Sequence, residues 1–155
     1  MIVDIKTKGP VEWFKWEEVA NNLSKKSIKL QIKDWANFMI HAVMMNELRI
    51  WAVATFPAIF KNGLHVSSWY RDPEFNALPS VGGDANSIHL DARATDIDNI
   101  PENLYHDLTI AWQVICQLHD KVGGVNYYEW GMHFDSYEDK FGHKSFQIRD
   151  YRKEK

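Results

Sequence analysis

The feature that most limits the fold of this chain is a helical spacing of apolar residues in three separate segments. Residues 10–23, 34–51 and 101–119 each repeat apolar side chains at steps of three and four. This period places the apolar side chains on one face of an α-helix, which must be buried against another layer. Asp34 as an N-cap and Pro101 at a first helical position mark two of the starts. The expected buried face of the second helix consists of Trp35, Phe38, Met39, Ala42, Met45 and Leu48.

Strand-type sequence lies between and after the later helical segments. Residues 64–70 are rich in strand formers, and residues 125–137 and 144–151 alternate aromatic with polar side chains, as strands do. Residues 71–83 hold two prolines and paired glycines and are expected to form a loop. Helices followed by a group of short strands favour an α+β fold, with a small antiparallel sheet and flanking helices. We expect a single domain over residues 1–155.

Composition narrows the class of partner and the location. The formal net charge is −3 at pH 7, which excludes a nucleic-acid partner held mainly by phosphate contacts. Cys116 is the single cysteine and lies in an apolar run, which predicts a core residue and no internal disulfide. The N-terminus lacks the pattern of a secretory signal, and the most apolar run is too short to span a bilayer. We therefore expect a soluble monomer without membrane insertion, cytoplasmic because it has no export signal of its own.

One stretch, "SVGGDANSIHLDARATDID" at residues 80–98, carries candidate metal ligands. His89 and Asp96 in this stretch are residue types that bind Zn²⁺. His133 lies in "EWGMHFD" on an expected strand, where Asp135 points to the same side two residues later. Two histidines and one carboxylate leave a fourth coordination position for water, which is the arrangement of catalytic rather than structural zinc.

These motifs resemble those of the M15 zinc peptidases, which include D-Ala-D-Ala carboxypeptidases and related phage endolysins. The family pattern "SGYRSPEYN…VGGxxNSxHxxGxAxD" followed by "HVD" is similar to "SSWYRDPEFNALPSVGGDANSIHLDARATDID" and "MHFD" in this chain. The similarity covers about residues 67–97 and 133–135, and the order and spacing of the short motifs make it specific. The resemblance implies the α+β fold of the hedgehog and D-Ala-D-Ala peptidase type.

The resemblance also implies roles for individual residues. One Zn²⁺ per chain would be held by His89, Asp96 and His133. Arg71 would bind a substrate carboxylate or stabilise an oxyanion, and Ser87 would lie close to the bound substrate. The implied substrate is the peptide stem of bacterial peptidoglycan, cut at D-Ala-D-Ala or at L-Ala-D-Glu. Such an enzyme would act on the cell wall of a phage-infected host or be delivered in a virion.

The chain departs from the family pattern at two places that affect the chemistry. The glycine three residues after the first histidine is Ala92, which is strained if the turn needs a positive φ. The acidic residue three before the last histidine is Trp130, so the general base is open between Glu129 and Asp135. Glu129 is slightly favoured because the family supplies this carboxylate from upstream, although in a straight strand it would lie about 13 Å from His133. Asp135 would act as the base or orient His133.

Other residues and functions stay open at this stage. Trp130, with Trp69 and Tyr127, lies near the motifs and offers an aromatic face for substrate, on which a sugar could stack. His65 and His143 could approach the metal, and the remaining histidines are expected to be structural or exposed. One alternative function is a cell-wall-binding or phage structural protein with impaired catalysis. Another is a zinc amidase that cuts beside the sugar.

Overall fold

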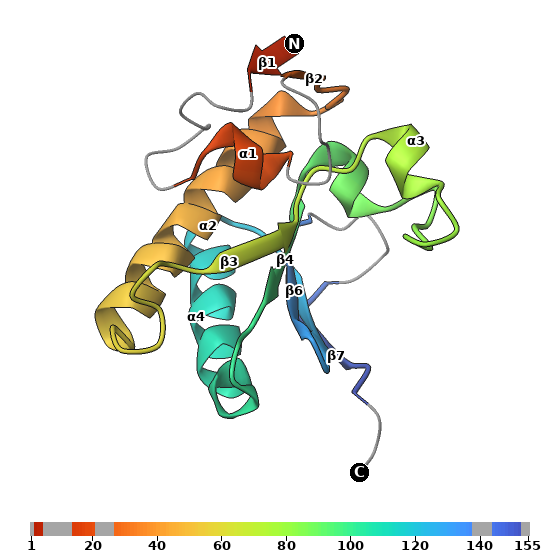
Figure 1. The fold of residues 1–155 in the computed structure, drawn as a ribbon. Coiled ribbons are helices and arrows are strands. Elements are labelled where there is room, and N and C mark those ends of the chain that lie inside the picture. The colour runs from red at the N-terminus through yellow and green to blue at the C-terminus, as the bar shows by residue number, and fades with distance from the viewer. Residues whose placement is uncertain (1, 5–13, 21–26, 138–143, 153–155) are drawn as a thin grey trace.

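The protein, described here by a computed structural model, places two long helices against one face of a five-stranded sheet (Figure 1). The structure describes residues 2–4, 14–20, 27–137 and 144–152. The helices are α2 (Trp35–Thr55) and α4 (Tyr105–Leu118). The strand order in space is β3 (His65–Ser68), β4 (Ala94–Asp98), β6 (Gly131–Asp135), β5 (Gly124–Tyr128) and β7 (Gln147–Asp150). The expected α+β class with flanking helices is confirmed.

Smaller elements surround this two-layer frame. A separate antiparallel pair is formed by β1 (Ile2–Asp4) and β2 (Ser27–Lys29). The short helices are α1 (Trp16–Val19) and α3 (Pro73–Asn76), and two 3₁₀ turns are η1 (Ile88–Asp91) and η2 (Glu102–Leu104). In Figure 1, α3 and the turn that follows it lie on the side of the sheet away from α2 and α4.

The sheet is antiparallel except at one edge. β3 pairs with β4, β4 with β6 and β6 with β5 in antiparallel register, whereas β7 pairs with β5 in parallel register. β6 already has a neighbour on each side, so the chain that leaves it must join an edge of the sheet. β7 begins beside the start of β5, where Gln147 pairs with Gly124, and it runs in the same direction as β5. β7 thus adds one parallel pair to the expected antiparallel sheet.

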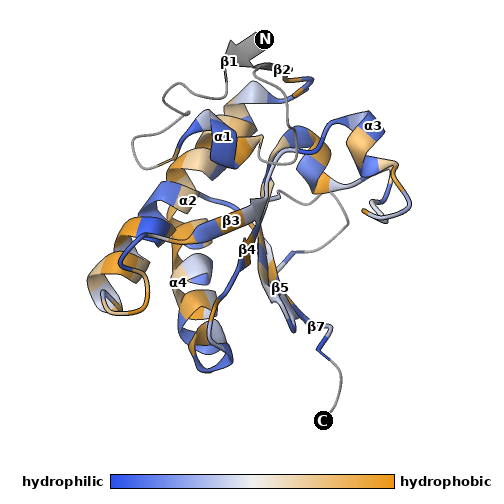
Figure 2. Ribbon diagram, in the orientation of Figure 1, coloured by the Kyte–Doolittle hydropathy of each residue, from blue (hydrophilic) through white to orange (hydrophobic). Residues whose placement is uncertain are grey.

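The second expected helix is confirmed as α2. Asp34 caps it, because its Oδ1 accepts a hydrogen bond from the backbone nitrogen of Asn37 at 3.0 Å. The helix continues past the expected end at residue 51. Met39 is an error in the expected face, since it is 39% exposed and His41 faces the core instead. Figure 2 shows the alternation of hydrophobic and hydrophilic residues along α2 and α4. The expected residues that are fully buried are Phe38, Ala42, Met45 and Leu48.

The other expected segments differ in their bounds. Of the helix expected over residues 10–23, the structure describes α1 and the extended Lys15 before it, while residues 10–13 and 21–23 lie outside the described residues. The expected loop over residues 71–83 contains α3, because Asp72 caps a short helix that begins with a proline. The third expected helix begins as the turn η2 and continues as α4.

Residues 125–137, expected as one strand, form the hairpin of β5 and β6. Gly131 permits this hairpin, because its φ is +154° and a Cβ there would lie 2.1 Å from the backbone oxygen of Ile97. The hairpin pairs Asn126 with His133. The alternating pattern continues through the tight turn, so the sequence predicts one strand where the structure has two.

Aromatic side chains fill the space between the helices and the sheet. Trp69 and Trp112 are fully buried there, and Cys116 is 1% exposed, as expected for a core residue. Burial raises the pKa of the Cys116 thiol, so this side chain is inert. Within the described residues, none of the helices has the length and apolar character that crossing a membrane requires.

Candidate metal centre

The centre of the candidate site is a pair of side chains on adjacent strands. Asp96 in β4 and His133 in β6 are register partners. Thr95 makes a hydrogen bond with His41 of α2, so alternation along the strand directs Asp96 to the sheet face opposite the helices. His133 Nδ1 lies 2.7 Å from Asp96 Oδ1. The sheet itself therefore fixes the spacing of two expected metal ligands.

His89 reaches this pair from the turn η1. Ser87 caps the turn, its hydroxyl oxygen accepting a hydrogen bond from the His89 backbone nitrogen at 3.3 Å. Ala92 ends the turn with a φ of 54°, so the turn does need the strained left-handed conformation that the sequence raised as a concern. The His89 Nδ1–H donates to the backbone oxygen of Trp69 at 2.7 Å. Since Nδ1 carries the proton, the lone pair of His89 Nε2 faces Asp96, 3.4 Å from Oδ1.

The three side chains form a donor set that fits a small metal ion. One ligand atom each from His89, Asp96 and His133 lies within 4.8 Å of the others. Ligand atoms about 2.1 Å from a tetrahedral zinc are roughly 3.4 Å apart, close to the separation of His89 Nε2 and Asp96 Oδ1. A nitrogen lone pair that faces a carboxylate oxygen needs a proton or a cation between the two atoms. Both the geometry and the chemistry of the cluster therefore suit zinc.

Burial and mutual contacts set the protonation of the cluster. Burial lowers the pKa of His89, and the contact with Asp96 opposes this only in part. Burial acts to raise the pKa of Asp96, but His89 and His133 hold it far below its usual range. Burial acts to lower the pKa of His133, but hydrogen bonds to Asp135 and Asp96 raise it to about 9. At neutral pH the metal-free protein therefore holds an ionised Asp96, a neutral His89 and a protonated His133.

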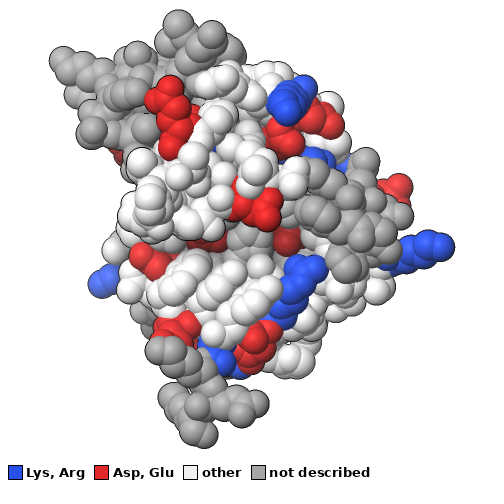
Figure 3. Space-filling view, turned by 90° about the vertical axis from the view of Figure 1, so that its right-hand side faces the viewer, with Lys and Arg blue, Asp and Glu red and all other residues white. Residues whose placement is uncertain are grey.

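The cluster opens into a cavity of about 750 Å³ on the face away from the helices. Figure 3 shows this face, hollowed across its middle, with acidic atoms recessed in the hollow. The segment from Val81 to Ile88 forms one wall, and side chains of β5 and β7 form another. Ligand pockets in proteins have volumes of about 300–1,000 Å³, so a cavity of this size can hold a small ligand.

The chain matches the family model for peptidase M15 over residues 21–135. This match covers most of the chain and includes His89, Asp96 and His133. The chain belongs to the peptidase M15 family. Membership supports a metallopeptidase, and the cluster is compatible with its metal site. No curated protein and no solved structure matches the chain.

Arg71 is tied to the M15 site through Asp96. Its Nη2 donates to Asp96 Oδ2 at 2.7 Å, and its Nε donates to Ser68 Oγ at 2.9 Å. The Arg71 guanidinium therefore binds Oδ2 of Asp96, while Oδ1 of Asp96 faces the two histidines. Arg71 and Ser87 both line the cavity, so the structure brings these two of the expected substrate-facing residues beside the cluster.

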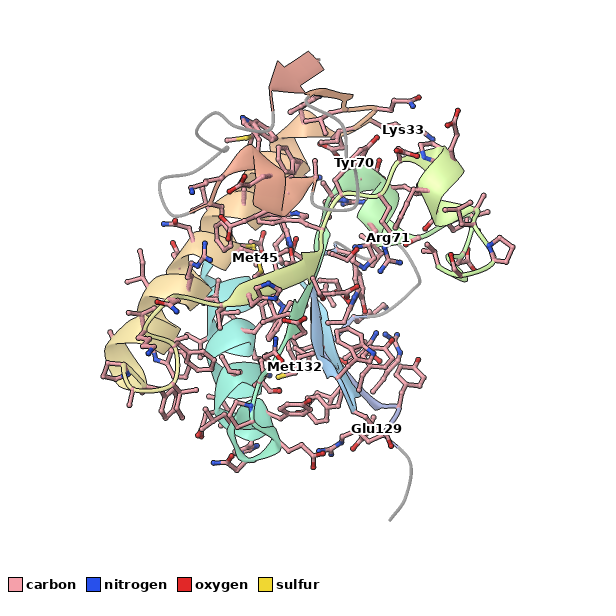
Figure 4. The ribbon with its side chains drawn as sticks, viewed as in Figure 1. Lys33, Met45, Tyr70, Arg71, Glu129 and Met132 are labelled. Atoms are coloured by element: carbon pink, nitrogen blue, oxygen red, sulfur yellow. The ribbon has the colours of Figure 1, made fainter. Side chains whose placement is uncertain are left out.

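The two candidates for the general base lie in different places. Glu129 is in the exposed turn between β5 and β6 and is not among the described residues that line the cavity. Figure 4 shows it well below Arg71, toward the far end of the sheet. Asp135 lines the cavity, is 1% exposed, and has its Oδ2 3.5 Å from His133 Nε2. The structure therefore groups Asp135, and not the favoured Glu129, with the candidate metal ligands.

The histidines left unassigned by the sequence do not join the cluster where they are described. His41 is buried between Ser136 and Thr95 on the helix side of the sheet, and burial lowers its pKa so far that it stays neutral. His65 makes its hydrogen bond with Asp98. His143 lies outside the described residues.

Sequence reasoning missed the cavity wall that β5 and β7 provide. Tyr128, Arg149 and Tyr151 line the cavity at this wall. Trp130, which the sequence predicts to face substrate, lines the cavity beside them and is 46% exposed. Asn126, the register partner of His133, also lines the wall. Recognition of the turn after Tyr128 would have placed Asn126 and Tyr128 on the side of His133. No local sequence pattern predicts the parallel pairing of β7 with β5 that brings Tyr151 to this wall.

Proposed function

We propose that the protein is a zinc-dependent peptidase that hydrolyses the peptide stem of bacterial peptidoglycan. The observation that carries this proposal is the His89–Asp96–His133 cluster, which lines an open cavity in a member of the M15 family. Zinc would be held by His89 Nε2, Asp96 Oδ1 and His133 Nδ1. When bound there, zinc polarises the scissile carbonyl and lowers the pKa of water to about 7.

Asp135 is the residue to which we give the proton transfer. Its Oδ2 faces His133, while its Oδ1 is buried and has no hydrogen-bond partner among the described residues. A buried carboxylate oxygen without a partner is unfavourable, so a water or a substrate group is expected to satisfy it. In this proposal Oδ1 accepts the proton of the attacking water through an intervening water and returns it to the leaving amine, because Asp135 lies on the Nε2 side of the His133 ring and the metal-binding Nδ1 on the other. Oδ2 meanwhile keeps the His133 ring in position.

Arg71 is proposed to bind negative charge on the substrate. A guanidinium has five N–H donors, and the contacts to Asp96 and Ser68 leave others for a carbonyl oxygen or a stem carboxylate. Ser87 lines the same part of the cavity and is proposed to contact the bound peptide. The bonds considered are D-Ala-D-Ala and L-Ala-D-Glu, and the proposed setting is a phage-type lysis enzyme that reaches the cell wall as a monomer.

The test combines metal content with turnover. Protein purified without a His-tag should contain one zinc per chain and release new amino termini from peptidoglycan, and a chelator should abolish the release. Asp135→Asn should keep zinc at saturating concentration and lose roughly 10²-fold or more in kcat. Glu129→Gln is the matched control, since it removes a carboxylate of the same hairpin and should leave kcat within about twofold.

Two results would contradict the proposal. Zinc without release of amino termini from several cell-wall types would indicate a cell-wall-binding or structural protein with impaired catalysis. Equal losses in Asp135→Asn and Glu129→Gln would remove the assignment of the proton transfer to Asp135.

A further inference from the structure

Three aromatic rings form a stack at the hairpin end of the cavity. Tyr128 stacks on Trp130 with ring centroids 4.8 Å apart and 12° between the planes, and on Tyr151 at 5.2 Å and 13°. β5 lies between β6 and β7, so Tyr128 is the middle ring, with the hairpin turn on one side and β7 on the other. All three rings line the cavity that holds the metal cluster.

The outer rings of this stack present flat faces to solvent. Trp130 is 46% exposed and Tyr151 is 56% exposed, although Tyr128 covers one face of each ring. The core pair of Trp112 and Phe134 is packed differently, edge to face, with 76° between the ring planes. A near-parallel stack holds its rings in fixed orientation, which reduces the entropy lost when a flat ligand packs on an outer face.

We propose that the Trp130–Tyr128–Tyr151 stack is a subsite for a sugar ring attached to the peptide that is cut. The inference rests on the proposed function, since the stems of peptidoglycan are carried by sugars. A pyranose has an apolar C–H face, which suits the negative face of an aromatic ring, and polar groups around its edge. Asn126 supplies a polar group beside the stack, because its Oδ1 is buried without a hydrogen-bond partner among the described residues. A nucleobase would also stack, but the net charge of −3 disfavours its phosphates.

The position of the stack along the sheet selects between the candidate bonds. Tyr128 is two residues from Asn126, the register partner of His133, which corresponds to roughly 7 Å along β5. The outer faces belong to Trp130 and Tyr151, whose ring centroids lie 4.8 and 5.2 Å from that of Tyr128, across the strand direction. A sugar packed on either face adds about 4 Å, which puts it roughly 11 Å from the level of the cluster. An extended peptide covers about 3.3–3.6 Å per residue, so the sugar would lie roughly three residue lengths from the bond at the cluster. This favours L-Ala-D-Glu, the candidate bond nearer the sugar, over D-Ala-D-Ala.

Sugar binding can be measured without catalysis. Zinc-loaded protein would be titrated with the N-acetylglucosamine trimer, with the glucose trimer as a second probe, and the indole N–H signals followed by NMR. The Trp130 signal should shift on addition of the acetylated trimer, and the double variant Trp130→Ala/Tyr151→Ala should weaken binding about tenfold or more. The matched control is Leu118→Ala/Ile148→Ala, which removes two exposed apolar side chains outside the cavity and should bind as the wild type does. No shift of the Trp130 signal, or equal loss in both double variants, would overturn the subsite.

Turnover gives a second and independent measurement. The kcat/KM for a disaccharide-linked stem should exceed that for the free stem peptide about tenfold, and the aromatic double variant should reduce this ratio to about one. The free peptide lacks the sugar, so the double variant should reduce its kcat/KM far less than that of the disaccharide-linked stem. Mass spectrometry should find the sugar fragment with one alanine attached.

The outcomes separate the two proposals. Equal rates for both substrates, or release of D-Ala alone, would overturn the sugar subsite and leave the peptidase intact. Binding of the acetylated trimer without hydrolysis of either substrate would keep the sugar subsite and overturn the peptidase.

Discussion

Zinc affinity is predicted to depend steeply on pH, because a proton occupies one of the ligands in the metal-free protein. Hydrogen bonds to Asp135 and Asp96 overcome burial and raise the pKa of His133 to about 9. The Nδ1–H of this ring points at Asp96 Oδ1, 2.7 Å away, where the metal would bind. At pH 7 only about one molecule in a hundred has lost this proton, so the apparent dissociation constant is weaker by about 100-fold, or about 3 kcal/mol.

The assay is competition with a chelator of known proton affinity between about pH 6.5 and 8.5. The zinc dissociation constant, corrected for chelator protonation, should fall about tenfold for each pH unit. Calorimetry near pH 7 in buffers of different ionisation enthalpy should show about one proton released per zinc bound. A dissociation constant that is flat above about pH 7, as a histidine of ordinary pKa gives, would refute the reasoning.

Asp135→Asn shows which carboxylate sets the pH dependence. The variant replaces one of the two charged acceptors of His133 with a neutral amide, so the pKa of His133 should fall and fewer protons should be released near pH 7. Loss of the charged contact to His133 Nε2 should also weaken zinc binding by about 10- to 100-fold where the pH dependence levels off. Glu129→Gln should keep the wild-type slope, because Glu129 lies outside the cavity lining.

The raised pKa of His133 makes the metal-free protein less stable as the pH rises, whereas zinc affinity increases over the same range. The folded-state pKa of His133 lies above the ordinary value of 6.5, so its stabilising contribution is complete below pH 6.5 and is lost as the pH rises through about 9. Urea unfolding of the zinc-free protein should therefore show a falling free energy over this range. The zinc-loaded protein should become more stable over the same range, because zinc binds the deprotonated ring.

Four substitutions at three positions test the local geometry. Ala92→Gly removes the strain of a left-handed alanine, worth about 1–2 kcal/mol, but it also removes a buried methyl group and raises the entropy of the unfolded chain. These effects oppose each other, so the free energy of unfolding in urea should stay within about 1 kcal/mol of wild type. Ala92→Val should instead lower the free energy of unfolding by more than about 2 kcal/mol. Gly131→Ala places a Cβ against a backbone oxygen of β4 and should cost about 2–3 kcal/mol in urea together with zinc affinity, and unchanged values would show that the hairpin does not need glycine. Asp96→Asn removes the charge that faces both histidines and Arg71, so elemental analysis should find little zinc, and full occupancy would exclude Asp96 as a ligand.

The sequence predicted those elements whose formation depends on residues close together in the chain. The period of apolar residues and the cap at Asp34 located α2, because both are properties of one helix. The spacing of His89, Asp96 and His133 located the cluster through its resemblance to a family. The strand at residues 94–98 was not predicted, because it is short and central and its burial differs little from one side to the other.

The features that sequence reasoning missed depend on contacts between distant segments. The distance to Glu129 was estimated for a straight strand, whereas the chain turns there and leaves Glu129 outside the cavity. Tyr151 meets Tyr128 only because β7 joins the β5 edge in parallel, and no local pattern specifies that choice. Met39 was misassigned because it lies at the border of the helical face, where one position decides between core and solvent.

The geometry of the candidate metal centre depends most on Asp96, because its two oxygens have separate partners. Oδ2 is 2.7 Å from Arg71 Nη2, while Oδ1 faces His89 and His133. A carboxylate held from both sides cannot rotate freely, so Oδ1 is presented for single-atom coordination before any metal arrives. Zinc at this position would take the place of the proton on His133 and leave the pair of Asp96 with Arg71 intact. Arg71 therefore sets the direction of a ligand oxygen as well as facing the cavity, and its contribution to metal binding cannot be separated from its contribution to the substrate by removing its charge alone.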